Sequence, residues 1–347
     1  MLMLLPLFLF IRFFVQGSAP IIYRPEYAPP VLRSFEQQIY ACDGMTSRTV
    51  AEYLAERYRA LTFYVPDPVS DDDLAKVHSR TYLTSLAQTS VIRRIAELPA
   101  VSRTIPYFVL RRAILDPMRY VVGGTIQAGE CARIHGWSIQ LGGGYVQARK
   151  DEGSAGDFFA DIPLAVALLR STYPDMTILV IDLDAFPAQG VATYVQEDQK
   201  LWLFDLYASA HACSTVSCSR VIRVQVPAWV TDSQYERVLK EQLPRMLDLC
   251  MPDLVFYHAG LSVLAQDTHG KMRISSTGLS WRDAYVCGEL FARNIPCALI
   301  ISEGTCPEAG RAAARSVDHV IRTHELIASD MHMKKARAMK QKGNKHG

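Results

Sequence analysis

The sequence has 347 residues, 49% of them hydrophobic, which is enough for a sizeable core and excludes a largely disordered chain. Lys and Arg total 37 against 35 Asp and Glu, but six of the positive residues lie in the last fourteen positions. The rest is slightly acidic, which argues against direct nucleic-acid binding by the folded part, because phosphate contacts need Lys and Arg clustered there.

Residues 1–19 form an apolar leader that contains one charged residue, Arg12. The run is shorter than the ~20 residues that a membrane-spanning helix needs, so it gives no firm span. It matches the core of a signal peptide better, although no positive charge precedes it. We keep three interpretations open: a targeting segment, a misassigned start, and a true anchor.

Eight cysteines are scattered without any Cys-x-x-Cys pair or zinc-ribbon spacing. Most lie in apolar surroundings, which is typical of buried free thiols in a reducing compartment. The sequence therefore predicts a cytoplasmic or nuclear protein without a disulfide framework.

Seven short apolar runs predict strands that are buried on both faces, as in a parallel sheet. They lie at residues 21–23, 138–141, 177–181, 201–206, 221–226, 253–257 and 298–301.

Helical patterns occupy the intervening segments. Residues 43–130 are expected to be mainly helical, with Asp43 as a cap and a loop at 66–68. Further helices are predicted at 157–173, with Asp157 as N-cap, at 232–250, bent at Pro244, and at 278–294 and 308–328.

This alternation predicts an α/β fold: a single doubly wound domain over residues 20–328 with a central, mainly parallel sheet. Residues 329–347 are interpreted as a basic, disordered tail. A nuclear-targeting or anion-binding patch is the alternative for that tail.

In such sheets, ligands bind beyond the carboxyl ends of the strands. Asp182 and Asp184 stand there, two residues apart, and can converge on a cation. The same Asp-x-Asp pattern occurs in glycosyltransferases and phosphatases and as simple strand termination. The glycine run at 142–144 lacks the spacing of a dinucleotide loop and instead favours a close backbone approach or a narrow pocket.

Together these segments resemble the histone deacetylase family, which has the arginase/deacetylase fold, and its class IV branch in particular. The matching text is PIIY at 20–23, VHSRTYL at 77–83, GGTIQAG at 123–129, GW at 136–137, GGG at 142–144, ADI at 160–162, IDLDA at 181–185, YHAG at 257–260 and SEG at 302–304. The segments occur in the family's order over about residues 20–325.

The resemblance implies hydrolysis of an acyl-lysine amide at a zinc ion held by two Asp and one His, with a His pair as base and a Tyr as oxyanion donor. Asp184 matches the first zinc Asp, and Asp182 matches a residue that supports a monovalent-cation site. The other family positions hold Phe186 for the zinc His, Ser262 for the second zinc Asp, Val146 and Gln147 for the His pair, and Thr305 for the Tyr.

These replacements predict a catalytically inactive pseudo-deacetylase without a resident zinc, acting as a scaffold, a regulator or a binder of acyl-lysine-like ligands. Its pocket would be formed by Gly143, Gly144, Tyr145 and Gly304, with Phe186 filling the void left by the metal.

Two alternatives stay open. The first is an active zinc-dependent lysine deacylase whose site is rebuilt around Asp184 with His258 or His211. The second is a non-enzymatic binder of a cation at Asp182 and Asp184.

Overall fold

The computed structural model describes residues 20–27, 46–59, 61–213, 216, 218–302 and 304–327. The described strands form one parallel sheet of seven strands in the order β1-β2-β7-β6-β3-β4-β5. The strands are β1 (Ile21–Ile22), β2 (Trp137–Gln140), β3 (Ile178–Asp182), β4 (Leu201–Ala208), β5 (Val221–Val226), β6 (Leu254–Ala259) and β7 (Cys297–Ile301). The predicted strands and the parallel α/β class are confirmed.

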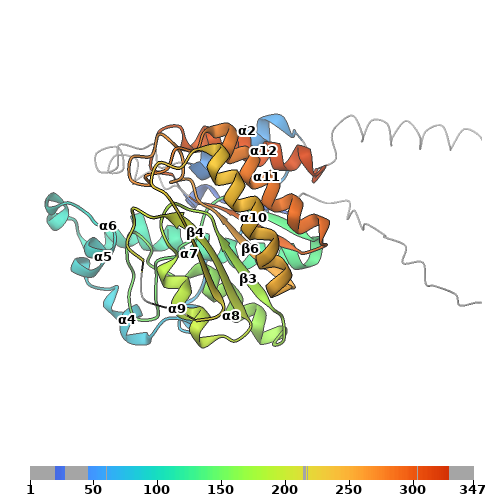
Figure 1. The fold of residues 1–347 in the computed structure, drawn as a ribbon. Helices are drawn as coiled ribbons and strands as arrows, with labels where there is room; N and C mark the ends of the chain where they lie inside the picture. The colour runs from blue at the N-terminus through green and yellow to red at the C-terminus, as the bar shows by residue number, and fades with distance from the viewer. Residues whose placement is uncertain are drawn as a thin grey trace, which may run out of the picture.

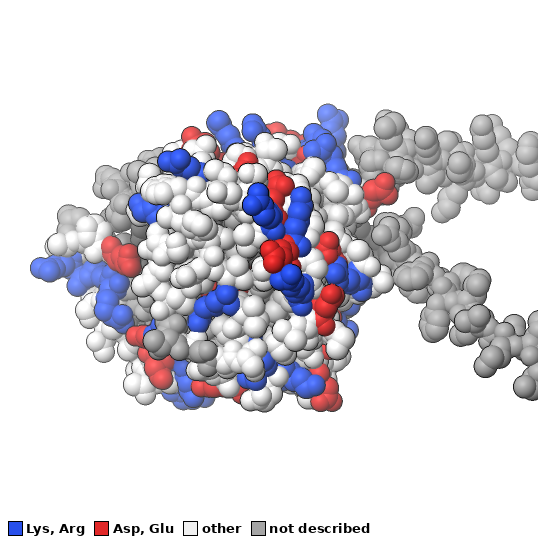
Figure 2. Space-filling model, viewed as in Figure 1, with Lys and Arg blue, Asp and Glu red and all other residues white. Residues whose placement is uncertain are grey.

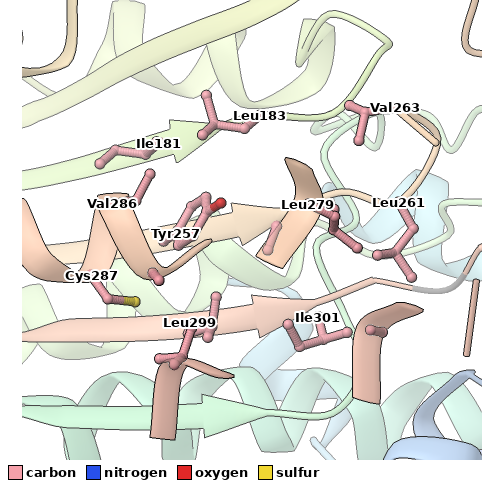
Figure 3. Close-up of a cluster of buried hydrophobic side chains, with 14 of the residues drawn as sticks. Ile181, Leu183, Tyr257, Leu261, Val263, Leu279, Val286, Cys287, Leu299 and Ile301 are labelled. Atoms are coloured by element: carbon pink, nitrogen blue, oxygen red, sulfur yellow. The ribbon is translucent and has the colours of Figure 1, made fainter. Parts of the chain in front are cut away.

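The central strands are apolar along their whole length because helices cover both faces of the sheet. Every residue of β3, β6 and β7 is buried. One face packs against α2 (Thr46–Arg57), α10 (Asp232–Cys250), α11 (Ser276–Ala292) and α12 (Ala309–Thr323), as Figure 1 shows. In Figure 3, Ile181, Tyr257 and Leu299 of this face meet Val286 and Cys287 of α11.

The opposite face packs against α7 (Asp116–His135), α8 (Asp161–Thr172) and α9 (Gln189–Glu197) (Figure 1). Val180 and Phe256 of the strands lie in the same core as Ala165 and Val191 of these helices. The two faces together give the doubly wound layers that the sequence predicts.

A group of short helices projects beside α7, at the left of Figure 1. It comprises α3 (Asp71–Leu74), α4 (Arg80–Ser85), α5 (Thr89–Ile95), the 3-10 turn η2 (Ala100–Thr104), α6 (Tyr107–Leu110) and the π-turn η3 (Arg111–Leu115). These helices share a third core that includes Leu74, Ile92, Leu110 and Phe159. The mainly helical character expected for residues 43–130 is confirmed over its described part, and so is the loop at 66–68.

Two helix boundaries differ from the predictions, and one helix was missed. The helix expected over 157–173 begins at Asp161, so Asp157 is not its N-cap. The Oδ2 atom of Asp157 instead accepts a hydrogen bond from the Gln147 backbone, 2.8 Å away, and the next two residues are buried before the helix starts. The helix predicted to reach residue 328 ends at Thr323, and α9 was not predicted.

The leader at 1–19, the tail at 329–347 and the expected cap Asp43 lie outside the described residues. Within the described ranges, no helix combines the length and the apolar character needed to cross a membrane.

Candidate functional site at the carboxyl edge of the sheet

Three polar residues lie side by side across the ends of three adjacent strands. Asp182 ends β3, and the sheet register pairs it with Asp205 of β4 on one side and His258 of β6 on the other. All three are buried, with at most 2% of their surface exposed. Buried polar groups need partners, so this row is the first place to look for a site.

His258 forms a close pair with Asp182, with 3.1 Å between Nδ1 and Oδ1. Burial alone would lower the pKa of the imidazole, but the carboxylates of Asp182 and Asp184 outweigh it and raise the pKa to about 9. The ring lies against Gly144, where a Cβ atom would fall 2.3 Å from Cδ2. Gly144 also has φ +76°, so both its backbone and the ring require glycine there.

Asp184 extends beyond the end of β3 and is partly buried. Its Oδ1 accepts a hydrogen bond from the backbone N–H of Ser262, 3.1 Å away. Gly260 packs so closely that a Cβ atom there would lie 2.3 Å from the Asp184 carboxylate. Burial raises the pKa of Asp184, while the charge of His258 acts in the opposite direction.

Asp161, at the start of α8, holds the glycine run in place. Its Oδ2 accepts from Gly144 N at 2.9 Å and from Thr125 Oγ1 at 2.7 Å, and its Oδ1 accepts from Tyr145 N at 2.9 Å. The side chain is fully buried, and burial raises its pKa. Asp161 therefore fixes the loop that carries three of the four predicted pocket residues.

A buried arginine supports the same edge from the α11 side. Arg282 Nη1 donates to the carbonyls of Leu183 and Gly260, at 3.0 and 2.8 Å. Its Nε pairs with Asp283 Oδ1 at 2.8 Å, and that carboxylate also accepts from the hydroxyl of Tyr257 at 2.5 Å. One guanidinium thus ties together the segments that carry Asp184 and Ser262.

Asp182 and Asp205 each keep one buried carboxylate oxygen without a hydrogen-bond partner, Oδ2 and Oδ1 respectively. Two basic groups flank the pair: Nδ1 of His258 lies 3.1 Å from the other oxygen of Asp182, and Nε of Arg223 lies 3.5 Å from the other oxygen of Asp205. Burial and the neighbouring charge of Asp182 raise the pKa of Asp205 well above its usual value. The ring nitrogens of His258, in the same row, also have no hydrogen-bond partner.

Val146 and Gln147, the positions predicted for the His pair, carry no titratable group. Val146 is buried in the core beside α8 and α9. The Gln147 side chain donates to the carbonyl of Pro187 at 2.9 Å. Neither residue can accept a proton from water, so the loop supplies no general base at these positions.

Phe186 lies directly beyond Asp184, and its ring packs against the imidazole of His211 with 4.2 Å between centroids. His211 in turn donates through Nε2 to the carbonyl of Gly270 at 3.1 Å. Thr305 is exposed, and its hydroxyl donates to the buried carboxylate of Asp267. His211 is therefore committed to the loop at Gly270.

These residues do not fit a zinc ion. Among the described residues, no group of three His, Cys, Asp or Glu side chains is arranged to hold a metal. Catalytic zinc requires three protein ligands of the N, S or carboxylate type, and Asp184 has a phenyl ring and a hydroxyl at the predicted partner positions.

The four predicted pocket residues lie in two separate segments of the chain. Gly143 and Gly144 lie in the loop held by Asp161, Tyr145 follows them, and Gly304 lies against Leu261, whose side chain is labelled in Figure 3. A cavity of about 300 Å³ lies elsewhere, at the amino-terminal edge of the sheet, lined by residues at the ends of α11 and α12. It contains none of the predicted pocket residues.

Sequence reasoning placed Asp182 and Asp184 correctly at the sheet edge but missed the residues that position the edge. Asp161 was noted only as part of a motif, and Arg282, Asp283 and Asp267 were not singled out. The adjacent Arg282 and Asp283 in the middle of a helix were the available signal for the first pair, since charged residues are rarely buried unless paired.

The seven-stranded parallel sheet with helices on both faces and acidic residues at its carboxyl edge defines an α/β protein of the arginase/deacetylase fold, in the hydrolase superfamily. The chain belongs to the histone deacetylase family, because a family model described as the histone deacetylase domain matches residues 43–323.

Individual relatives agree with this assignment. The chain is 32% identical over 259 residues to histone deacetylase 2 of Arabidopsis thaliana, covering 74% of this chain and 67% of the relative. It is 24% identical over 310 residues to an uncharacterised protein of Picosynechococcus sp., covering 89% and 96% respectively. It is also 22% identical over 296 residues to histone deacetylase 8 of Danio rerio, covering 78% and 74%.

Proposed function

We propose that this chain is a pseudo-deacetylase, which keeps the framework of a histone deacetylase and acts as a scaffold, a regulator or a binder of acyl-lysine-like ligands. The observation that carries the proposal is the set of groups around the Asp184 carboxylate. This carboxylate accepts the backbone N–H of Ser262, and its predicted metal partners, Phe186 and Ser262, offer no charged ligand.

Amide hydrolysis also needs a proton acceptor for the attacking water. The imidazole nearest to Asp184 is His258, and its carboxylate neighbours raise its pKa to about 9. It is therefore protonated at neutral pH and serves as a positive charge among the carboxylates. This supports a binding role over turnover.

The alternative is an active deacylase rebuilt around Asp184. It requires His258 or His211 to supply a ligand to a shared metal ion. His258 is paired with Asp182, and His211 is engaged with Phe186 and Gly270. His211 would have to leave its partners, and His258 would have to lose the ring proton that its raised pKa favours.

Metal analysis of the purified full chain after equilibration with zinc, together with hydrolysis assays on acetyl-lysine and long-chain acyl-lysine peptides, tests the proposal. We expect far less than one zinc per chain and no turnover above that of Asp184→Ala. The Phe186→His, Ser262→Asp double variant restores three zinc ligands and is expected to bind about one zinc. Stoichiometric zinc in the unchanged chain, with turnover abolished by Asp184→Ala, would overturn the proposal.

We further propose that a monovalent cation binds between Asp182 and Asp205. The support is their two buried, unpartnered oxygens on neighbouring strands. Thermal unfolding in potassium chloride against tetramethylammonium chloride at equal ionic strength tests this. A higher melting temperature in potassium, absent in Asp205→Ala, is expected, and equal melting temperatures in both salts would refute the cation.

A further inference from the structure

A second surface stands out beside the site. Residues 88–115, which we call the arginine arm, span α5, η2, α6 and η3 and belong to the projection at the left of Figure 1. Five arginines lie in the arm against a single acidic residue, Glu97: Arg93, Arg94, Arg103, Arg111 and Arg112. Figure 2 shows Lys and Arg side chains gathered on this projection.

Most of these arginines have no carboxylate partner. Arg94, Arg103 and Arg112 are exposed, and within the described residues none of them lies within ion-pair distance of an acidic side chain. Arg111 is the exception, since its Nε lies 3.2 Å from Asp116. Elsewhere in the described residues some exposed arginines are paired, as Arg245 is with Glu241 at 3.0 Å, and others, such as Arg311, are not. The arm therefore presents uncompensated positive charge.

The arm also exposes a large apolar side chain. Phe108 of α6 has 69% of its surface exposed, and its neighbours Ile105 and Tyr107 are half-buried. Aromatic and arginine side chains are enriched at the energetic centres of protein interfaces. Charge and apolar surface thus coincide on the same short segment.

The arm is a built element anchored to the domain. Ile92, Ile95, Leu110 and Ile114 point into the third core and are at most 8% exposed. The helical segments α6, η3 and α7 follow one another without a break from Tyr107 to His135. A surface held in this way loses little conformational entropy on binding.

The arm is also connected to the candidate site by hydrogen bonds. The carbonyl of Ile95 accepts from Gly156 N at 2.8 Å, and the next residue, Asp157, accepts from Gln147 N at 2.8 Å. A partner on the arm would therefore lie one loop away from the glycine run.

We propose that the arginine arm docks an acidic segment of a partner protein, with Phe108 as the apolar anchor. Guanidinium groups bind carboxylates through paired hydrogen bonds, and acidic segments with interspersed apolar residues supply both features. This interaction goes beyond the proposed function and does not depend on whether the domain is catalytic.

Two other anionic partners fit less well. Insertion into a membrane surface requires an amphipathic helix with a broad apolar face, whereas the described residues of the arm have one strongly exposed large apolar side chain, Phe108. A nucleic acid presents a long row of phosphates, whereas the rest of the face shown in Figure 2 carries acidic and basic side chains interspersed.

The test is fluorescence anisotropy with the full chain and a labelled peptide in which Glu alternates with Leu and Phe, against the same peptide with Gln for Glu. We expect salt-sensitive binding of the Glu peptide only. The Arg94→Ala, Arg103→Ala, Arg112→Ala triple variant should weaken binding by about tenfold or more, and Phe108→Ser by about fivefold.

A matched control removes the same amount of charge elsewhere. Arg245→Ala, Arg311→Ala, Arg315→Ala takes three exposed arginines from α10 and α12 and should change the affinity by less than about twofold. Circular dichroism confirms that each variant folds. Equal losses in the arm and control variants, or no binding of the Glu peptide, would overturn the proposal.

Phosphatidylserine-containing vesicles and duplex DNA serve as competing probes in the same variants. If either binds through the arm and the Glu peptide does not, the partner is not an acidic protein segment and the proposal fails. Binding of the Glu peptide that neither probe displaces supports it.

Discussion

The residues that position the carboxyl edge of the sheet differ in burial and charge from the residues at the catalytic and zinc-ligand positions that the family resemblance assigns. The holding residues Asp161 and Arg282 are fully buried, charged, and bonded to several backbone groups. Apart from Asp184, the positions that the resemblance assigns to catalysis and zinc binding carry apolar or neutral side chains, such as Val146 and Phe186, which pack or bond locally. The residues that position this edge are thus different from the residues at the positions that the family resemblance assigns to catalysis.

The largest expected effect follows from removing Arg282. The Arg282→Ala change leaves the buried carboxylate of Asp283 without its cation and frees the carbonyls of Leu183 and Gly260. We expect a loss of about 3–5 kcal/mol in the free energy of unfolding, measured by urea denaturation. The surface change Arg245→Ala is the control, with an effect near zero. A loss as small as the control's would mean that the edge does not depend on this guanidinium.

Removing Asp161 should have the next largest effect. Asp161→Ala leaves the buried N–H of Gly144 without its acceptor and removes the acceptors of Tyr145 N and Thr125 Oγ1. We expect a loss of about 3 kcal/mol, together with faster hydrogen exchange at Gly144 and Tyr145. Asp161→Asn keeps one acceptor oxygen, so its free energy of unfolding should lie between those of the unchanged protein and Asp161→Ala. Unchanged hydrogen exchange at Gly144 in Asp161→Ala would show that the Asp161 carboxylate does not hold the glycine loop in place.

A pH dependence is expected from His78, another buried holding residue. Its Nε2 accepts from Ala160 N at 2.9 Å, and burial lowers the pKa of the imidazole. Its contribution to stability is therefore present above the unfolded pKa of about 6.5 and is lost as the pH falls through the folded pKa. His78→Gln, which does not titrate, should lose less stability below about pH 6.5, by about 1.4 kcal/mol for each unit of pKa lowering. Parallel pH profiles for both proteins would contradict this.

The smallest effect on stability is expected at Gln147, one of the two positions predicted for the His pair. Gln147 is half-buried and makes one side-chain hydrogen bond, to Pro187. Replacing it by the residue expected in the family, Gln147→His, should change stability by less than about 1 kcal/mol and produce no turnover alone. A loss of stability comparable to that of Asp161→Ala would mean that Gln147 supports the sheet edge as strongly as Asp161 does.

Much of the fold could be predicted from the sequence, because buried parallel strands carry continuous apolar runs such as 178–182 and 297–301. The residues at which helices begin were harder to predict. The helix α8 begins without a side-chain cap, and so does α9, whose N-cap is Ala188 and which contains Gly190. Neither helix has a Ser, Thr, Asp or Asn at its N-cap, and the acidic residue at 157 offered a false cap.

The pairing of Asp182 with His258 could not be predicted from the sequence, for a different reason. The two residues are 76 positions apart, and they meet because β6 lies beside β3 in the sheet. Strand order in a doubly wound sheet does not follow chain order, so the sequence alone places both residues at one edge without making them neighbours.

The strand order also determines when the sheet can be completed during synthesis. β1 and β2 form one end and β3, β4 and β5 the other, while β6 and β7, which join them, are the last strands along the chain. A nascent chain that stops before residue 254 holds two sheet fragments with open edges and a buried Asp182 without its imidazole partner. Such a chain exposes pairing-competent edges until the final strands emerge, which makes the second half of translation the period of greatest risk of aggregation.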